Sequence, residues 1–265
     1  MKLTIIVDNR PGNEQCIIEH GLAMYIEHKG TELLYDFAQS DEAYFHNVKA
    51  LGIDIDKVKT AVLSHGHYDH TGALPQISGK RIILHPDCFT QRYGKLKKYY
   101  AGMPVTRDEL GRDNELVETA TPYAITEDIH FLTSIPRLND FEALEFPTML
   151  ADGSEDELHD DSAIAFIGDK GLIIIAGCSH SGICNIVEYA KKVTGIDRVQ
   201  AIIGGFHLRE VDANLDKVIA YFRDLKADYV ITGHCTCDEA IQILRDKLGN
   251  DCHFDVMGVG KSFDL

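Results

Sequence analysis

Positive charge is scarce in this sequence. Its 265 residues include 26 lysines and arginines against 42 aspartates and glutamates, which gives a formal net charge of −16 at pH 7. Proteins that bind nucleic acid usually carry a basic surface, because they neutralise backbone phosphates. The deficit of basic residues therefore argues against a nucleic-acid partner and disfavours a nuclease. It leaves room for a small anionic substrate bound by a local basic pocket.

Long apolar runs and paired cysteines are missing as well. No apolar stretch approaches the ~20 residues that a membrane-spanning helix needs, and no secretory signal is recognisable. The seven cysteines are an odd number without the spacing of a small disulfide-linked scaffold. We therefore expect a cytoplasmic protein with no membrane partner and with all of its cysteines reduced.

The chain also lacks a low-complexity tract and an obvious linker, so we expect a single domain over residues 1–265. In the C-terminal half, strand-like runs such as 199–203 alternate with helical patterns such as 183–193. This alternation is typical of an α/β fold with layered sheets and helices. The segment at about 87–150 is rich in glycine and proline, and we expect it to be an irregular, pocket-shaping insertion.

Shorter patterns predict the N-terminal elements. Residues 2–7 form an apolar, β-branched run that predicts a strand. The runs 21–28 and 31–37 predict a hairpin across a Lys-Gly turn. Ser40 is placed to cap a helix over 41–51, whose apolar positions fit helical periodicity.

Three imidazoles and one carboxylate lie within six consecutive positions, at His65, His67, Asp69 and His70. Buried imidazoles need partners for their ring nitrogens, and a divalent cation meets that need directly. The preceding residues 60–63 predict a short buried strand, so the motif lies on a loop at a strand end, where a scaffold can hold ligands rigidly. The motif predicts a metal site, and a histidine-rich surface turn is the alternative.

Three more histidines, His180, His207 and His234, each follow a strand-like apolar run and small residues. In layered α/β folds, strand ends along one edge are where sites assemble. A single histidine in such a place is more often structural. Three of them together with the histidine-rich loop favour a functional site.

Charged clusters give two weaker signals. Asp160 and Asp161 are candidate acceptors for the outer N–H groups of ligating imidazoles, or simply part of an acidic turn. A basic cluster is either a solvated face or an anion-binding rim; it consists of Arg92, Lys95, Lys97 and Lys98, with Tyr99 and Tyr100 beside it.

The run from Ser64 to Gly72 resembles the His-x-His-x-Asp-His signature of the metallo-β-lactamase fold superfamily. Three later motifs are similar to one branch of metal-dependent hydrolases, which includes the archaeal dihydropterin–ribofuranosylaminobenzene phosphate synthases. These motifs are Gly177-Cys178-Ser179-His180-Ser181-Gly182, Gly204-Gly205-Phe206-His207 and Gly233-His234-Cys235-Thr236. The resemblance spans Asp36 to Gly260. It implies an αββα sandwich, in which two facing sheets are covered by helices and metals lie at one edge between the sheets.

The resemblance also implies a ligand set. It assigns His65 and His67 to a first metal and Asp69 and His70 to a second, with His234 as the last ligand of the second site. His180 is expected as a further ligand, with His159, Cys178 and Asp160 as open alternatives. The expected cofactors are two divalent ions, zinc first, with manganese, iron or magnesium as alternatives. Because histidines and aspartate supply the ligands, we expect no cysteine to be a primary ligand.

The expected chemistry follows from two metals about 3.5–4 Å apart, which can share a water and lower its pKa toward ~7. Asp69 would orient this metal-activated water, His207 would contact the substrate or donate a proton, and Asp161 is a further candidate substrate contact. We expect a hydrolase of a small ester, lactone or phosphoester. A synthase that uses a pterin pyrophosphate is the alternative. A non-hydrolytic diiron redox protein is less favoured, because such proteins have Glu where this chain has His67.

Overall fold

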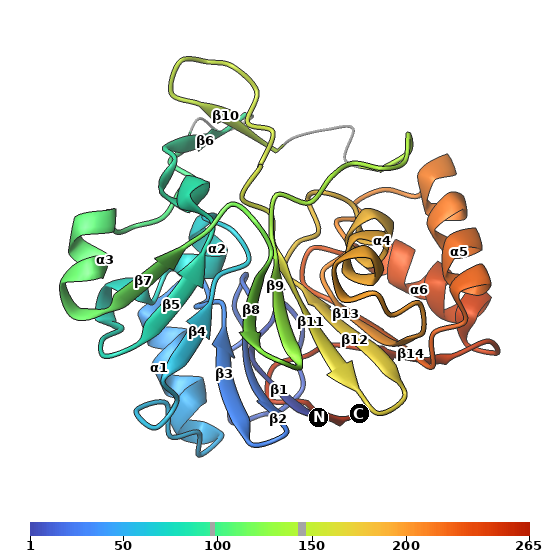
Figure 1. Ribbon diagram of the computed structural model, residues 1–265, viewed down its shortest axis with the longest axis horizontal. Coiled ribbons are helices and arrows are strands. Elements are labelled where there is room, and N and C mark those ends of the chain that lie inside the picture. The colour runs from blue at the N-terminus through green and yellow to red at the C-terminus, as the bar shows by residue number, and fades with distance from the viewer. Residues whose placement is uncertain (96–98, 143–146) are drawn as a thin grey trace. The chain divides into compact units, whose positions relative to one another are not determined.

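The computed structural model describes residues 1–95, 99–142 and 147–265, which form two compact units. The first unit comprises the described residues within 1–120, 147–160 and 258–265. The second comprises 121–142 and 161–257. Each unit has its own sheet, helices and hydrophobic core (Figure 1). The expectation of one domain over the whole chain stays a prediction.

The first unit is built on a seven-stranded mixed sheet with the order β16-β1-β2-β3-β4-β5-β7. Its strands are β1 (Lys2–Val7), β2 (Ala23–His28), β3 (Thr31–Tyr35), β4 (Thr60–Val62), β5 (Arg81–Leu84), β7 (Glu115–Glu118) and β16 (Ser262–Asp264). β16, β1, β2 and β3 pair antiparallel, whereas β3, β4, β5 and β7 pair parallel. Parallel strands end at the same edge of a sheet, so the loop after β4 lies at the edge where sites form in such sheets.

Helices cover one face of this sheet. They are α1 (Asp41–Ala50), the one-turn α2 (Tyr68–Thr71) and α3 (Arg107–Asp113), with 3₁₀ turns at Leu74–Gln76 and Pro86–Phe89. Tyr44 of α1 and Leu110 of α3 belong to one buried cluster with Ile82 of β5, which shows how the helices pack on the sheet. A separate two-stranded ribbon pairs β6 (Arg92–Gly94) with β10 (Thr148–Leu150).

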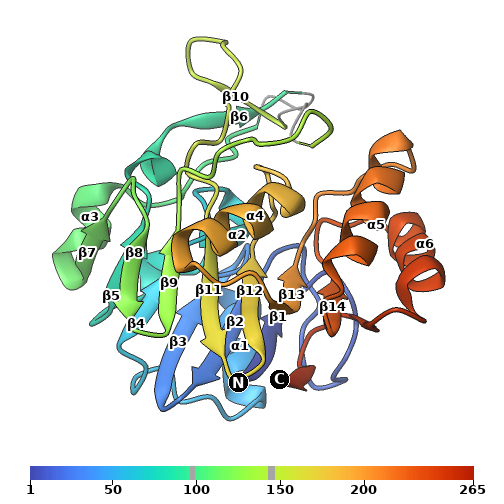
Figure 2. The same ribbon diagram turned by 45° about the vertical axis from the view of Figure 1, so that its right-hand side comes forward.

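The second unit has a seven-stranded sheet with the order β15-β14-β13-β12-β11-β9-β8. Its strands are β8 (Tyr123–Thr126), β9 (Ile129–Leu132), β11 (Ala163–Gly168), β12 (Gly171–Ala176), β13 (Val199–Gly204), β14 (Tyr229–Thr232) and β15 (His253–Val256), and β12 to β15 run parallel. The helices α4 (Ile183–Thr194), α5 (Ala213–Leu225) and α6 (Asp238–Leu248) pack on it, with α5 and α6 side by side (Figure 2).

Most of the predicted elements are confirmed, with differences where the local signal is short. Ser40 caps α1 by accepting a hydrogen bond from the Ala43 N–H. The histidine motif, expected on a loop, contains the one-turn helix α2, which begins at Tyr68. The expected insertion at 87–150 contributes β7 to the first sheet and β8 and β9 to the second, so its four-residue strands are integral to the two units. Its pocket-shaping role stays a prediction. Among the described residues, no helix is long and apolar enough to cross a membrane.

Candidate metal centre

The histidine loop, residues 65–70, brings four of the predicted ligands together in the first unit. Nε2 of His65 lies 2.9 Å from Nδ1 of His67, and Nε2 of His70 lies 3.8 Å from Oδ2 of Asp69. The ring centroids of His65 and His70 are 4.2 Å apart. The three imidazoles and Asp69 are all buried. Such a concentration of donor atoms within one buried loop suits a divalent cation.

The outer nitrogen of each imidazole faces a protein oxygen. Nδ1 of His65 lies 2.8 Å from Oγ of Ser64, and Nδ1 of His70 lies 2.7 Å from Oδ2 of Asp36. Nε2 of His67 lies 3.4 Å from Oγ1 of Thr148. Metal-binding histidines are held in this way, because an outer hydrogen bond fixes both the tautomer and the ring orientation. The nitrogens left to face the candidate metal are therefore Nε2 of His65, Nδ1 of His67 and Nε2 of His70.

The protonation of these imidazoles also suits metal binding. Burial, reinforced by the neighbouring His70 and His67, lowers the pKa of His65 well below its usual range. Burial, with the positive charge of Arg92, lowers the pKa of His67 to about 3. Both rings are neutral at pH 7, which is the state a metal ligand requires. The donor atoms, their orientation and their protonation thus fit a divalent metal.

Asp36 is the structural anchor of the loop. Its carboxylate accepts hydrogen bonds from the Ser64 N–H and hydroxyl, both at 2.7 Å, in addition to its contact with His70. Asp36 is fully buried and has a positive φ of 58°. Non-glycine residues pay about 1–3 kcal/mol for such a conformation, which persists where the surroundings demand it. In the sequence, Asp36 lies within the predicted strand run 31–37 and begins the stretch that resembles the family.

Arg92 is buried and paired with carboxylates, so both the predicted solvated face and the predicted anion-binding rim are wrong for this residue. Its guanidinium donates from Nη1 to both carboxylate oxygens of Asp160, at 3.2 and 3.0 Å, and its Nε lies 3.1 Å from Oδ2 of Asp156. Burial would raise the pKa of Asp160, but Arg92 lowers it below its usual range. Lys97 and Lys98, which belong to the same predicted cluster, lie outside the described residues.

The Arg92 network, which we define as Arg92, Asp156, Asp160 and Thr148, holds the histidine loop at two points. Oδ2 of Asp160 accepts a hydrogen bond from the Gly66 N–H at 2.8 Å. Thr148, which contacts His67, donates its hydroxyl to Asp156 at 3.0 Å. A Cβ at Gly66 would lie 2.0 Å from the Cys88 carbonyl oxygen, so only glycine fits between the two histidines.

In the second unit, His180, His207 and His234 follow β12, β13 and β14. The rings of His180 and His207 have centroids 4.4 Å apart. His207 and His234 adopt positive φ angles of 51° and 48°, which turn the chain sharply after each strand. These three predicted residues therefore lie at the carboxyl ends of neighbouring parallel strands, as the sequence indicated.

Thiols accompany these histidines. Nε2 of His234 lies 3.2 Å from Sγ of Cys178, and ligand atoms of Cys178, His207 and Cys235 lie within 4.8 Å of one another. The expectation that no cysteine is a primary ligand stays a prediction. A thiolate is a good zinc ligand, and the Cys178 thiol lies beside His234. Cys178 is therefore the cysteine on which this expectation should be tested.

Two other predicted residues have different surroundings. Asp161 is fully buried, and its Oδ2 accepts a hydrogen bond from the Ser181 N–H at 2.8 Å, so it supports the turn that carries His180. Its expected contact with substrate stays a prediction. His159 has a side chain that is 62% exposed and lies 3.4 Å from Glu157, outside the histidine loop.

His20 is a further neighbour of the histidine loop that no sequence motif indicated. Its Nε2 lies 3.1 Å from Oδ2 of Asp69. Nothing in the spacing signals this contact, because the loop between β1 and β2 brings His20 to the histidine loop only in the folded unit.

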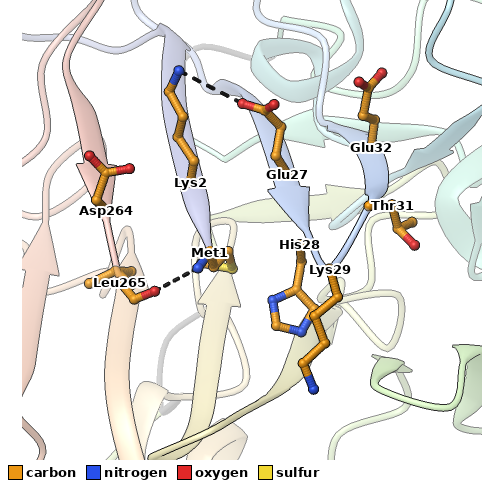
Figure 3. Close-up of a pocket in the computed structure, with 10 residues that line it drawn as sticks. Met1, Lys2, Glu27, His28, Lys29, Thr31, Glu32, Asp264 and Leu265 are labelled. Carbon is orange, nitrogen blue, oxygen red and sulfur yellow. Dashed lines mark hydrogen bonds and ion pairs between the residues drawn. The ribbon is translucent and has the colours of Figure 1, made fainter.

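The first unit also has an open hollow of about 580 Å³ beside β1 and β2 (Figure 3). It is lined by residues such as Lys2, Glu27, Lys29 and Glu32, and by none of the predicted site residues. Lys2 lies 3.8 Å from Glu27, so charges of opposite sign are already paired at its wall. This mixture of charges favours no particular ligand.

Comparison with known proteins identifies the protein family to which this fold and this histidine loop belong. The family model of the metallo-beta-lactamase superfamily matches residues 18–85, which contain the whole loop. A protein of Methanocaldococcus jannaschii without a characterised function is 33% identical over 248 residues, covering 90% of this chain and 92% of its own. The chain belongs to the metallo-β-lactamase superfamily.

Two further relatives are more specific. The 7,8-dihydropterin-6-methyl-4-(beta-D-ribofuranosyl)-aminobenzene-5'-phosphate synthase of Methanocaldococcus jannaschii is 30% identical, covering 92% of this chain and 89% of its own. The crystal structure of a metal-dependent hydrolase of the beta-lactamase superfamily matches with a TM-score of 0.85 and 26% identity, over 100% of this chain and 99% of that one. The predicted α/β layered metallo-β-lactamase fold is confirmed.

Proposed function

We propose that this protein is a metal-dependent hydrolase that cleaves an ester, lactone or phosphoester bond. Its proposed substrate is a small cytoplasmic molecule, and a phosphorylated one is included. The observation that carries the proposal is the histidine loop. Its inner nitrogens on His65 and His67 lie 2.9 Å apart, while protein oxygens hold the outer nitrogens. A divalent ion needs neutral imidazoles that are held in place with their inner nitrogens close together. Burial of such imidazoles is otherwise energetically costly.

The residues that would hold the metals follow from this loop and from the family. His65, His67, Asp69 and His70 supply the ligands of the first unit, and the family resemblance adds His180 and His234 from the second. Two divalent ions, zinc first, are the proposed cofactors. When bound, such ions activate water as a nucleophile at neutral pH and polarise the substrate oxygen.

The remaining steps belong to the chain's own residues. Asp36 and Thr148 keep the outer nitrogens of His70 and His67 occupied, so the inner nitrogens stay turned to the site. Asp69 orients the water through its carboxylate. His207, which the resemblance leaves outside the ligand set, contacts the substrate and gives a proton to the leaving oxygen.

A synthase is the second candidate, favoured by the relative that carries this activity in its name. In this reaction the bond between a pterin methylene carbon and its pyrophosphate breaks, and an arylamine nitrogen forms the new bond to that carbon. The pyrophosphate carries away the bonding electron pair, and the amine loses a proton. A hydrolase would use water in place of the amine.

The decisive experiment starts with protein purified without chelators. We expect elemental analysis to find about two divalent metals per chain, because the ligand set exceeds one tetrahedral site. Activity is then measured on phosphodiesters, lactones and a dihydropterin pyrophosphate with and without the arylamine. Ester or lactone cleavage supports the hydrolase, and arylamine-dependent release of pyrophosphate supports the synthase. A metal content near zero after reconstitution contradicts both.

A further inference from the structure

His20 occupies a position that its exposure alone would not suggest. It lies on the loop between β1 and β2, and its side chain is 50% exposed. Its Nε2 is 3.1 Å from Oδ2 of Asp69, while its Nδ1 is 3.1 Å from Nδ2 of Asn9. One imidazole therefore joins a proposed metal ligand to the Asn9 amide at the start of the same loop.

The loop approaches Asp69 closely through its backbone as well. The Leu22 N–H donates to the Asp69 carbonyl oxygen at 3.1 Å. Gly21 has a positive φ of 148°, and a Cβ there would lie 2.7 Å from the same carbonyl oxygen. Glycine permits this approach, so His20 is held beside Asp69 by the main chain and does not reach it by chance.

The neighbours of Asn9 determine which nitrogen of His20 carries the proton. The Gly21 N–H can only donate, and it lies 3.1 Å from Oδ1 of Asn9, which must accept. The NH₂ group of Asn9 therefore faces Nδ1 of His20 and donates to it. A neutral His20 then has its proton on Nε2 and donates that proton to the Asp69 carboxylate.

We propose that His20 is a positioning residue for Asp69, kept in its Nε2–H form by Asn9. A carboxylate that binds a metal through one oxygen can rotate, and a directed N–H on its other side fixes that rotation. The consequence for metal binding rests on the proposed function. The arrangement of Asn9, His20 and Asp69 is itself seen in the structure.

The first test therefore uses metal-free, full-length protein. Nitrogen-15 NMR of the histidine rings reports which ring nitrogen carries the proton. The His20 signal is assigned by its loss in His20→Gln. We expect the Nε2–H form in the wild type and protons on both ring nitrogens in Asn9→Asp, because the introduced carboxylate and that of Asp69 can both only accept. An Nδ1–H form in the wild type overturns the proposal.

The second test measures metal affinity by titration with zinc, and with cobalt to follow its absorption spectrum. His20→Ala should weaken one of the two sites about 10–100-fold and alter its cobalt spectrum. His20→Gln, whose amide can still donate, should recover most of the affinity. His46→Ala is the matched control, because this exposed histidine on α1 is not a proposed ligand and has its Nε2 2.9 Å from the Gln15 carbonyl oxygen.

The outcomes separate this inference from the proposed function. Two metals in the wild type with unchanged affinity in His20→Ala overturn the positioning role and leave the hydrolase proposal intact. Equal losses in His20→Ala and His20→Gln also overturn it, because the donated hydrogen bond would not matter. A wild type that binds no metal overturns the proposed function, and the NMR result then decides the His20 arrangement alone.

Discussion

Each imidazole of the histidine loop has one ring nitrogen that contacts a protein oxygen and one that faces the candidate metal. The imidazole of His70 shows this division most clearly, because its Nδ1 lies 2.7 Å from Asp36 and its Nε2 faces Asp69. A hydrogen bond to a carboxylate makes the opposite ring nitrogen a better electron donor and fixes its direction. We therefore expect residues outside the proposed ligand set to influence how tightly a metal binds.

Asp36→Asn tests this at the residue scale. The asparagine amide has nearly the same shape, but it carries no negative charge and has only one oxygen. It therefore cannot accept all the hydrogen bonds that Ser64 and His70 make to the Asp36 carboxylate. We expect metal affinity to fall about 10–100-fold and the free energy of unfolding to fall by about 1–3 kcal/mol. Zinc titration and urea unfolding measure these changes. Asp54→Asn, at an exposed aspartate paired with Lys57, should change neither. Unaltered affinity in Asp36→Asn would contradict the anchor role.

His207 and His234 provide a second residue-scale prediction. Both end parallel strands with positive φ, so local geometry does not separate their roles. His234→Ala should lower the metal content, since the family resemblance makes it a ligand. His207→Ala should keep the metals and lower turnover by about 10²–10⁴-fold, as for loss of a general acid. Metal content measured on both variants decides the matter, and the reverse pattern would exchange the two assignments.

At the scale of elements, the ribbon of β6 and β10 brings charge into the interior of the first unit. β6 supplies Arg92, which is 1% exposed, and the chain after β10 supplies Asp156 and Asp160. A buried ion network of this kind adds little net stability, but each member depends on the others. Its geometrical effect is to fix Gly66 and, through Thr148, His67.

Arg92→Leu should therefore be strongly destabilising. Removal of the guanidinium leaves two buried carboxylates uncompensated, and we expect a loss of about 3–5 kcal/mol in the free energy of unfolding. The double variant Arg92→Leu with Asp160→Leu should lose less than the sum of the single variants. Arg107→Leu, which removes an exposed arginine paired with Glu118, should cost less than about 1 kcal/mol in the same urea experiment. Additive losses would contradict the coupling.

At the scale of the whole molecule, the proposed metals couple to stability. A ligand that binds only the folded state stabilises it by about 2.7 kcal/mol at a free concentration of one hundred times its Kd. We expect the thermal unfolding temperature to fall on chelator treatment and to recover with zinc. Calorimetry of His65→Ala, which lacks a proposed ligand, should show a smaller response. An unfolding temperature independent of zinc in the wild type would contradict a folded-state metal site.

The amino-acid sequence by itself determined the elements and most of the candidate ligands. Hydrophobic periodicity and capping located β1, α1 and α4, and the dense run His65-x-His67-x-Asp69-His70 located the histidine loop, because these signals are local. The resemblance added His180 and His234. Within 87–150, the strands were too short and too interrupted by glycine and proline for periodicity to show that they belong to the main sheets.

Only the tertiary structure decided which distant residues serve the histidine loop. Arg92 reads as part of an exposed basic cluster in the sequence, yet folding buries it against Asp160. Asp36 and His20 reach the loop across the sheet of the first unit, from positions that no spacing rule connects to it. Hydrogen bonds between segments far apart in the chain depend on chain reversal and strand pairing, and a local pattern carries no information about either.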